Sequence, residues 1–455
     1  MKKNLVWILV LFIAIFTAGY LIGCNPATSP VGSSGIDNGG GGGTEGGPGS
    51  ISLLAALHNA SNSSIVFKSL VFGSDGYIYL TGSTKSTIEG DSNNFLGGDY
   101  DAFVAKYDLS GTKIWVKEFG TAFEEQSLGI AVDSNGSIYA TGYTKGGLDG
   151  KTRTGYTDVF IVKYDSNGNR DTAWTKQFGA SSSSCKGYGI AVDSSNNVFI
   201  TGVANDNHFL LVKYDSNGNQ YKKELVNSGQ EGKALAVNNG YIYVTGYTSS
   251  TFEGYDISKA DYTSSFFIAK YDTSNFSGSS TPVWVSTFVS TGEDSGGGAA
   301  KQGLYPQSLA VDTGNIYVTG NNHGSFEGQT PSNPERLDFS DIFVIKCNKS
   351  DGTKNWAKQI GARTGNSGGY GITVDSGNTF VTGFTFGTLD DTGSGGAFII
   401  KYDSSGNKLG ISGYNKHYTD YGYCLAINGN YTYVAGNSSY SVNGTSEAFI
   451  SNAAK

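Results

Sequence analysis

The chain has 455 residues, including 67 glycines, 29 tyrosines and 25 phenylalanines, and its formal net charge is −8 at pH 7. This negative charge argues against a nucleic-acid partner, because binding to phosphates needs a basic surface that displaces counterions. Length alone would suggest about three domains, but an internal repeat takes up most of the chain, and repeat proteins do not follow that rule.

Residues 1–23 are predicted to be an export signal. Two lysines precede the apolar run 5–20, which is too short and too close to the terminus to favour a permanent membrane span. The next residues, Leu-Ile-Gly-Cys at 21–24, resemble the lipobox of bacterial lipoproteins, which implies cleavage before Cys24 and acylation of that residue. Several acyl chains anchor a protein firmly, at about 0.8 kcal/mol per buried methylene. The alternative is an uncleaved anchor helix.

Residues 24–50 are predicted to form a flexible linker. They contain Pro26, Pro30 and a run of glycines at 39–43, with hardly an apolar side chain. A segment of this composition cannot bury enough surface to fold. As a random coil it would span on the order of 30 Å and hold a folded head away from the lipid.

One five-residue phrase then recurs along the chain. Its copies lie at 78–82, 138–142, 198–202, 242–246, 316–320, 379–383 and 432–436. In every copy the second residue is aromatic, the fourth is Thr or Ala, and the fifth is Gly. Three further strand-length runs recur around each copy, so the unit consists of strands A to D with the phrase as strand B.

The repeat unit predicts the fold. Four short strands cannot bury both faces of their sheet alone, whereas seven such sheets in a ring can. We therefore predict an all-β fold, a seven-bladed β-propeller of four-stranded blades over residues 51–455. The first six blades are expected at about 69–120, 128–179, 188–226, 233–289, 307–361 and 370–413. Small residues in strand A, such as Ala131, are attributed to a crowded central channel.

The repeat resembles the bacterial seven-bladed β-propeller repeat family SBBP. The resemblance rests on GIAVDSNGSIYATGYT at 129–144 and on DAFVAKYD followed by W-x-K-x-F-G within 101–120. It covers roughly residues 51–452. It implies the propeller fold and exported or surface proteins, and it carries over no catalytic residue.

The ring is predicted to close with a strand from the N-terminal side. The seventh unit ends after its strand C at 447–452, and an unassigned strand-like run precedes the first strand A at 52–57. Residues 52–57 would serve as strand D of blade 7 and remove an exposed sheet edge. The alternative is that this run is linker and that the last blade has three strands.

The links within each unit are of two kinds. The A-to-B and C-to-D links are short turns such as Asp-Ser-Asn-Gly at 165–168, whereas the B-to-C and D-to-A links are long and variable. Because strands alternate in direction, the long links all emerge on one face of the ring, here called the loop face. The short turns emerge on the other, the hairpin face. Variable loops carry function, so a partner is expected on the loop face.

The sector of blades 4 to 6 is predicted to bind this partner. Exposed aromatic side chains beside polar groups suit a sugar ring or a protein hot spot. The candidate ligand-binding residues are Phe252, Tyr255, Tyr262, Tyr305, Phe326, Arg336 and Phe339. The alternative is that these aromatic residues pack the loops onto the ring.

Two recurrent acidic patterns contain residue types that calcium sites use. The Asp-Ser-Asn-Gly turns have Gly in the fourth position rather than the sixth that calcium loops use, so they are interpreted as hairpin turns. The B-to-C links repeat an apolar residue, an acid and Gly, as in Leu148-Asp149-Gly150. We expect the apolar residue to lie under the loop and the acid to cap backbone amides or pair with the strand C lysine. The alternative is a ring of carboxylates for cations.

No metal, cofactor or disulfide is predicted. Cys185, Cys347 and Cys424 fall in non-adjacent blades, so their Cα atoms should lie more than about 7 Å apart, and no spacing resembles a zinc site. The four histidines have neither ligand nor triad spacing. No catalytic residue is therefore proposed.

These observations favour a monomeric, lipid-anchored protein of the bacterial cell envelope, at the outer membrane or the cell surface. Its propeller would bind a protein or glycan partner through the variable loop face, as an adhesion or interaction module. The alternatives are a periplasmic scaffold for envelope assembly and a propeller hydrolase or lyase. The fold alone does not favour an enzyme.

Overall fold

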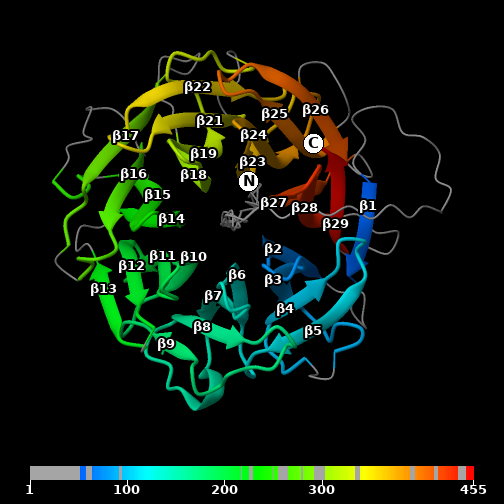
Figure 1. The fold of residues 1–455 in the computed structure, drawn as a ribbon, viewed down its shortest axis with the longest axis vertical. Coiled ribbons are helices and arrows are strands. Elements are labelled where there is room, and N and C mark those ends of the chain that lie inside the picture. Colours follow the sequence, from blue (N-terminus) through cyan, green and yellow to red (C-terminus); the bar gives the residue numbers. More distant parts are fainter. Residues whose placement is uncertain are drawn as a thin grey trace, which may run out of the picture.

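The strands radiate around a central axis as seven antiparallel sheets (Figure 1). The structure is a computed structural model that describes residues 52–57, 64–91, 95–216, 218–224, 229–249, 251–254, 265–277, 280–291, 303–333, 339–389, 395–414, 419–438 and 447–455. Each sheet is one blade with strand A innermost and strand D outermost. The predicted seven-bladed β-propeller of four-stranded blades is confirmed.

The strands divide among the blades as follows. Blade 1 contains β2 (Ile65–Phe72), β3 (Ile78–Thr84), β4 (Asp101–Tyr107) and β5 (Lys113–Phe119), and blade 2 contains β6 (Glu125–Val132), β7 (Ile138–Thr144), β8 (Asp158–Tyr164) and β9 (Lys176–Phe178). Blade 3 contains β10 (Lys186–Val192), β11 (Val198–Ala204), β12 (His208–Tyr214) and β13 (Gln220–Glu224), and blade 4 contains β14 (Gln230–Asn238), β15 (Tyr241–Thr248), β16 (Ser265–Asp272) and β17 (Trp284–Thr291).

Blade 5 contains β18 (Leu304–Val311), β19 (Asn315–Asn322), β21 (Asp341–Asn348) and β22 (Lys354–Ile360), and blade 6 contains β23 (Ser367–Asp375), β24 (Asn378–Thr385), β25 (Gly396–Tyr402) and β26 (Lys408–Tyr414). Blade 7 contains β27 (Asp420–Asn428), β28 (Tyr431–Ser438), β29 (Glu447–Ala454) and β1 (Ser52–Leu57). Two short elements lie in B-to-C links, the 3₁₀ turn η1 (Leu148–Gly150) and the strand β20 (Ser325–Phe326), which pairs with β17 of blade 4.

The ring closes through β1, as predicted. This strand pairs antiparallel with β29, from Ser52 opposite Asn452 to Leu57 opposite Ala448. In Figure 1 the blue β1 lies beside the red β29 at the outer edge of the ring. The chain thus joins its two ends in one sheet and covers the edge that β29 would otherwise expose.

Each innermost strand contains a β-bulge opposite the Gly of the repeated phrase. In blade 2, Ser127 pairs with Gly142 and Gly129 pairs with Thr141, which leaves one extra residue between them. A Cβ atom on Gly142 would lie 1.8 Å from the carbonyl oxygen of Gln126, and the same approach is 1.8–2.0 Å in all seven blades. Only Gly permits it. Because of the bulge, strand A also begins several residues before its predicted start, for example at Ile65 rather than residue 69.

The hydrophobic core lies between neighbouring blades. Ala131 and Tyr139 of blade 2, for example, pack against Ile190 and Ile200 of blade 3 in one buried cluster. The small residues of strand A therefore serve the blade-to-blade contact, and the expectation that they line a central channel is wrong.

The three described cysteines are buried thiols, as predicted. Burial raises the pKa of Cys347 to about 12, so this thiol stays protonated. No helix in the described ranges is long and apolar enough to span a membrane. The predicted signal, Cys24 and the linker lie outside the described residues.

Candidate functional site

The Asp-containing turns of the hairpin face satisfy their own carboxylates. Asp165 Oδ1 accepts the backbone N–H groups of Asn167 (2.9 Å) and Asn169 (2.8 Å), and its Oδ2 accepts the side-chain amide of Asn169 (2.7 Å). This is the hairpin-turn arrangement that the sequence predicted. Within the described part of the chain, no group of three or more Asp, Glu, His or Cys residues is placed to hold a metal ion.

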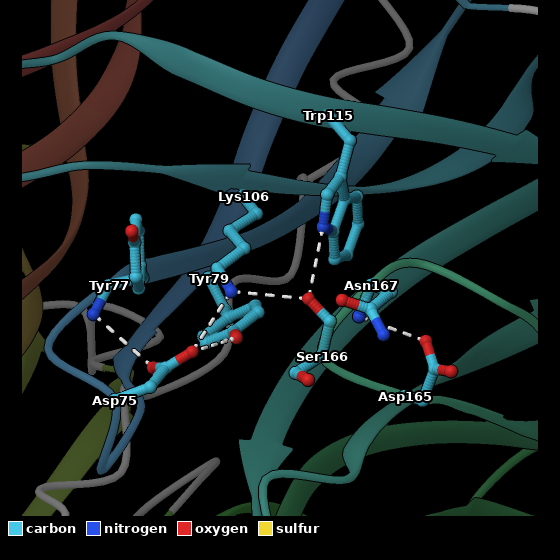
Figure 2. A network of polar contacts seen from close by, with 8 residues as sticks. All are labelled: Asp75, Tyr77, Tyr79, Lys106, Trp115, Asp165, Ser166 and Asn167. Carbon is cyan, nitrogen blue, oxygen red and sulfur yellow. Dashed lines mark hydrogen bonds and ion pairs between the residues drawn. The ribbon is translucent and has the colours of Figure 1, made fainter.

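Figure 2 shows how other polar groups of the hairpin face join blades 1 and 2. Lys106 on β4 forms an ion pair with Asp75 (2.9 Å) and donates to the backbone carbonyl of Ser166 (3.1 Å), which lies in the C-to-D turn of blade 2. The indole N–H of Trp115 on β5 donates to the same carbonyl (3.3 Å). One blade thus holds the outer turn of the next.

This contact recurs around the ring. Lys213 donates to the carbonyl of Thr273, Lys270 to that of Lys349, and Lys346 together with Trp356 to that of Ser404, at 2.9, 3.4, 3.0 and 3.1 Å. The strand C lysines therefore point toward the following blade. The polar groups of the hairpin face are engaged in this structural role, which leaves the loop face as the candidate binding surface.

The B-to-C links lie on the opposite side of each blade, against the preceding blade. The five apolar residues of these links that the structure describes are buried, as predicted, and Leu148 packs with Phe119 of blade 1. The acids contact groups of their own blade near strand D: Asp149 pairs with Arg170 (2.7 Å), and Glu327 pairs with Lys354. Of the two roles expected for these acids, pairing with a strand C lysine does not hold for Asp149 or Glu327, because those lysines face the other neighbour.

Seven side chains project from the bulges of the innermost strands. They are Lys68, Leu128, Tyr188, Lys233, Gln307, Tyr370 and Tyr423, one from each blade, and are here called the bulge ring. Several consecutive members contact one another across blade boundaries. Lys68 Nζ lies 4.6 Å from the ring centroid of Tyr423, and Lys233 Nζ lies 4.3 Å from that of Tyr188. Because the innermost strands surround the axis (Figure 1), these contacts place the bulge ring around it.

The bulge ring is aromatic on the side of blades 6 and 7. Tyr370 and Tyr423 lie 5.7 Å apart between ring centroids, and Tyr421, at the loop-face end of β27, lies 5.8 Å from Tyr423. Phe384 adds a fourth ring 5.1 Å from Tyr421. Phe386, 5.0 Å from Phe384, is 40 % exposed. Five aromatic rings thus form a continuous cluster, and Phe386 carries it to solvent on the loop face.

The side of blades 3 to 5 is charged as well as aromatic. Lys233 is buried and forms an ion pair with Glu231, whose carboxylate also accepts the hydroxyl of Tyr247 (2.8 Å). Burial lowers the pKa of Lys233 to about 8, although Glu231 opposes the shift. Tyr305 of blade 5 contacts Tyr247 at 6.2 Å between centroids and is 37 % exposed.

The ion pair of blade 2 continues this charged side. Glu124 pairs with Lys145 (2.6 Å) and accepts the hydroxyl of Tyr143 (2.7 Å). Lys186 lies over the ring of Tyr143, 4.7 Å from its centroid. The bulge ring and these neighbours on the loop face, aromatic on one side and ionic on the other, are here called the axial surface.

The residues proposed from sequence fall in different environments. Phe252 and Phe326 are completely buried, so their assignment as exposed ligand contacts is wrong and the alternative, loop packing, holds for both. Tyr305 belongs to the axial surface, and Phe339 is half-buried. The remaining three, Tyr255, Tyr262 and Arg336, lie outside the described residues.

Sequence reasoning did not find the bulge ring. A positional signal exists, because each member stands nine or ten residues before the first residue of a repeated phrase, as Leu128 does before Ile138 and Lys233 before Ile242. The residue types at this position differ, however, and no residue-type pattern marks it as special. Its orientation toward the axis follows from the bulge, which periodicity alone does not predict.

The comparison with family models agrees with the repeat architecture. Residues 114–149 and 173–209 match the model of the SBBP β-propeller repeat. Among curated proteins, the chain is 23 % identical over 382 residues to the regulatory protein FlaEY of Caulobacter vibrioides, a match that covers 74 % of this chain and 38 % of that protein. It is 26 % identical over 163 residues to the WD repeat-containing protein L264 of Acanthamoeba polyphaga mimivirus, covering 33 % and 11 %. The chain spans well under half of either relative.

Similar solved structures include a streptogramin B lyase, with a TM-score of 0.47 and 10 % identity over 88 % of this chain and 97 % of that one. The WD40 domain of Doa1 has a TM-score of 0.48 and 10 % identity over 88 % and 96 % of the two chains. The polysaccharide lyase Uly1 has a TM-score of 0.48 and 10 % identity over 96 % and 97 %. These likenesses concern the propeller fold alone.

Proposed function

The chain carries SBBP β-propeller repeats closed into a seven-bladed ring, and from this premise we propose that the ring is a binding module whose axial surface takes a protein or glycan partner. The observation that carries the proposal is the run of five contacting aromatic rings from Tyr370 to the exposed Phe386. Aromatic side chains give large contact area at low entropic cost.

The position of this surface also supports the proposal. The hairpin face uses its lysines and turn carbonyls to join blades, whereas the loop face presents aromatic and ionic groups around the axis. The ion pairs beside Tyr143 and Tyr247 offer hydrogen-bond acceptors and donors that would orient a polar ligand. We propose binding without catalysis, because both of these carboxylates are already paired with lysines.

The proposal extends to the setting of the molecule. We propose a monomeric lipoprotein of the cell envelope, anchored at Cys24, that presents the ring at the outer membrane or the cell surface. It needs no nucleic acid, metal or cofactor. A periplasmic assembly scaffold is the second candidate, and protease applied to intact cells separates the two, because only a surface-exposed ring would be removed.

The ligand site is tested by a matched pair of variants in blade 6. Phe386→Ala removes an exposed ring of the axial surface, and Leu409→Ala removes an exposed apolar side chain, 55 % accessible, near the hairpin end of β26. Partners found on an array of glycans and matrix proteins should bind Phe386→Ala at least about tenfold more weakly, which corresponds to about 1.4 kcal/mol.

The control variant Leu409→Ala should bind like the wild type. Equal loss in both variants, or loss only in the control, would place the site away from the axial surface. Phe386 is 40 % exposed and Leu409 is 55 % exposed, and a thermal melt of each variant checks that neither substitution unfolds the ring.

A further inference from the structure

One sector of the axial surface contains side-chain polar groups that make no hydrogen bond within the described part of the chain. It extends over the consecutive blades 5, 6, 7 and 1, whose innermost strands β18, β23, β27 and β2 follow one another around the axis (Figure 1). We call it the tyrosine sector, and its residues are Gln307, Asn321, Tyr370, Phe384, Tyr421, Tyr423, Asn437 and Lys68.

The three tyrosine hydroxyls of this sector are not engaged by the ring. Tyr370, Tyr421 and Tyr423 lie 5.7 to 6.4 Å apart between ring centroids, and their hydroxyls form no hydrogen bond with any residue of the described ranges. On the ionic side, by contrast, the hydroxyls of Tyr143 and Tyr247 each donate to a glutamate. The hydroxyls of the tyrosine sector can therefore both donate to a ligand and accept from it.

Three side-chain amides flank the aromatic rings. Gln307 is the bulge-ring member of blade 5, Asn321 lies near the loop-face end of β19, and Asn437 pairs across the strands with Tyr421. The amide oxygen of each is buried and has no hydrogen-bond partner among the described residues. Gln307 and Asn437 are only 6 % and 7 % exposed. Leaving such a group unpaired costs about 1–3 kcal/mol, and a ligand rich in hydroxyl groups would remove that cost.

The amide of Asn321 lies directly beside the aromatic cluster. A Cβ atom on Gly368 of β23 would lie 2.6 Å from Asn321 Oδ1 and 2.6 Å from Cε1 of Phe384. The two side chains are therefore neighbours over this glycine. Phe384 in turn contacts Tyr370 and Tyr421, at 5.2 and 5.1 Å between ring centroids. A ligand bound to these rings would be within reach of the amide.

The only charged side chain of the tyrosine sector is a lysine. Lys68 is half-buried, and its Nζ lies 4.6 Å from the ring centroid of Tyr423. It forms no ion pair within the described ranges, whereas Lys145 and Lys233 on the ionic side each pair with a glutamate. Burial lowers the pKa of Lys68 to about 8, so its ammonium group still carries a proton at pH 7. An anion beside it would stabilise this charged form.

This combination of groups suits an acidic sugar. A sugar ring can lie on the aromatic side chains, which offer large contact area, and its hydroxyls donate and accept as the amides and tyrosine hydroxyls do. A carboxylate or sulfate on the sugar would pair with the ammonium group through a charge-assisted hydrogen bond. The core of a protein interface is instead depleted in charged residues, and a protein partner would leave more of these polar groups unpaired.

We propose that the tyrosine sector binds an acidic oligosaccharide, with a sugar ring on the tyrosines, sugar hydroxyls on the amides, and the acidic group on Lys68. This inference rests on the proposed function, because it names the class of ligand that the axial surface takes. The acidic group lies at the boundary of blades 7 and 1, and the amides of Gln307 and Asn321 lie at the other end of the sector.

Matched pairs of oligosaccharides test the proposal on the full-length protein. The panel contains oligogalacturonate and oligomannuronate with their methyl esters, and dextran sulfate oligosaccharides with the parent dextran oligosaccharides. The wild type should bind at least one acidic form about tenfold or more tightly than its neutral counterpart, as one charge-assisted hydrogen bond predicts. The two kinds of acid show whether the group on Lys68 is a carboxylate or a sulfate.

Lys68→Met should remove this preference for the acid. The substitution keeps a side chain of similar length without the charge, so binding of the acidic form should fall about tenfold or more and binding of the neutral form should not change. The matched control is Lys85→Met in the same blade. Lys85 Nζ also lies 4.6 Å from a tyrosine ring centroid, that of Tyr100, but this lysine is exposed and outside the bulge ring, so the control should bind like the wild type.

Gln307→Met separates the contribution of the amides from that of the charge. It removes an uncharged hydrogen-bonding group, so binding of the acidic and the neutral form should weaken alike, by about fivefold. A thermal melt of each variant shows whether the ring is still folded.

Several results would overturn the acidic ligand. Equal binding of acidic and neutral forms by the wild type is sufficient and needs no variant. A preference for the acid that persists in Lys68→Met, or an equal loss in Lys85→Met, would also contradict it. If no acidic oligosaccharide binds while a protein or a neutral glycan binds in a manner that depends on Phe386, the acidic ligand is wrong and the proposed function stands. If no partner depends on Phe386, both are wrong.

Discussion

At the scale of single residues, the Gly that ends each repeated phrase and the bulge on the adjacent strand depend on each other. The bulge brings the carbonyl oxygen of Gln126 to 1.8 Å from where a Cβ of Gly142 would lie. The Thr before this Gly is also used, since the hydroxyl of Thr141 donates to the carbonyl of Phe160 (2.7 Å). The Gly and Thr by which the repeat is recognised are therefore the residues that permit the bulge and connect strands B and C.

Gly142→Ala should destabilise the ring substantially. The added methyl group meets backbone, which cannot rotate away, and overpacking of this kind costs about 1–3 kcal/mol. The midpoint of urea unfolding measures the loss. The control is Gly314→Ala, where a Cβ would meet nothing within 4 Å, and this variant should unfold within about 0.5 kcal/mol of the wild type. An unchanged midpoint for Gly142→Ala would mean that the strands separate at little cost.

At the scale of elements, the sequence predicted strands B and C well because both keep a fixed pattern in nearly every unit. Strand A was predicted to begin too late, since the residue of the bulge interrupts the alternation that marks a strand. The B-to-C links lie away from the strand C lysines, so one of the two roles expected for their acids, pairing with those lysines, does not hold for Asp149 and Glu327. Their position depends on packing against the preceding blade, which no local pattern encodes, and so the burial of Phe252 and Phe326 could not be foreseen from residue type.

Removal of β1 should weaken the whole ring. Deleting residues 52–57 leaves β29 without its outer partner and removes the buried Leu57 from the seam cluster. We expect a melting temperature several degrees lower and increased aggregation, because an open strand edge pairs with other molecules. Differential scanning fluorimetry and light scattering measure both effects.

Deletion of residues 25–48, which lie upstream of β1 and leave that strand intact, is the control for this experiment. It should leave the melting temperature unchanged. If the two deletions behave alike, then β1 contributes little to closure and blade 7 is stable with three strands.

At the scale of the whole molecule, each kind of contact between blades joins a blade to the same neighbour, either the following or the preceding one. Four strand C lysines reach the following blade, as Lys106 reaches Ser166, while B-to-C links such as that of Leu148 pack on the preceding blade. A blade is therefore fixed by different groups on its two sides. The seam differs from the other interfaces, because Asn452 stands where the other blades carry the strand C lysine.

The proposed lipid anchor is tested on the complete protein. Cys24→Ser removes the thiol that would be acylated, so the variant should stay in the aqueous phase of a detergent phase separation while the wild type enters the detergent phase. A wild type that remains aqueous would contradict lipidation at Cys24. The melting temperature of the ring should be the same in both, since the substitution lies upstream of β1.

The direction of β1 determines at which face of the ring a tether at the N-terminal side is attached. Strand C of every blade runs from the loop face to the hairpin face, and β1 is antiparallel to β29, with Ser52 opposite Asn452. The chain therefore enters the ring from the hairpin face. A tether that ends at Ser52 would hold the ring by its hairpin face. The axial surface would then point away from the membrane, toward the surrounding medium. In a circularly permuted chain with the tether attached at Leu57, the ring would be held by its loop face. The orientation would then be reversed, and the aromatic rings would point at the membrane.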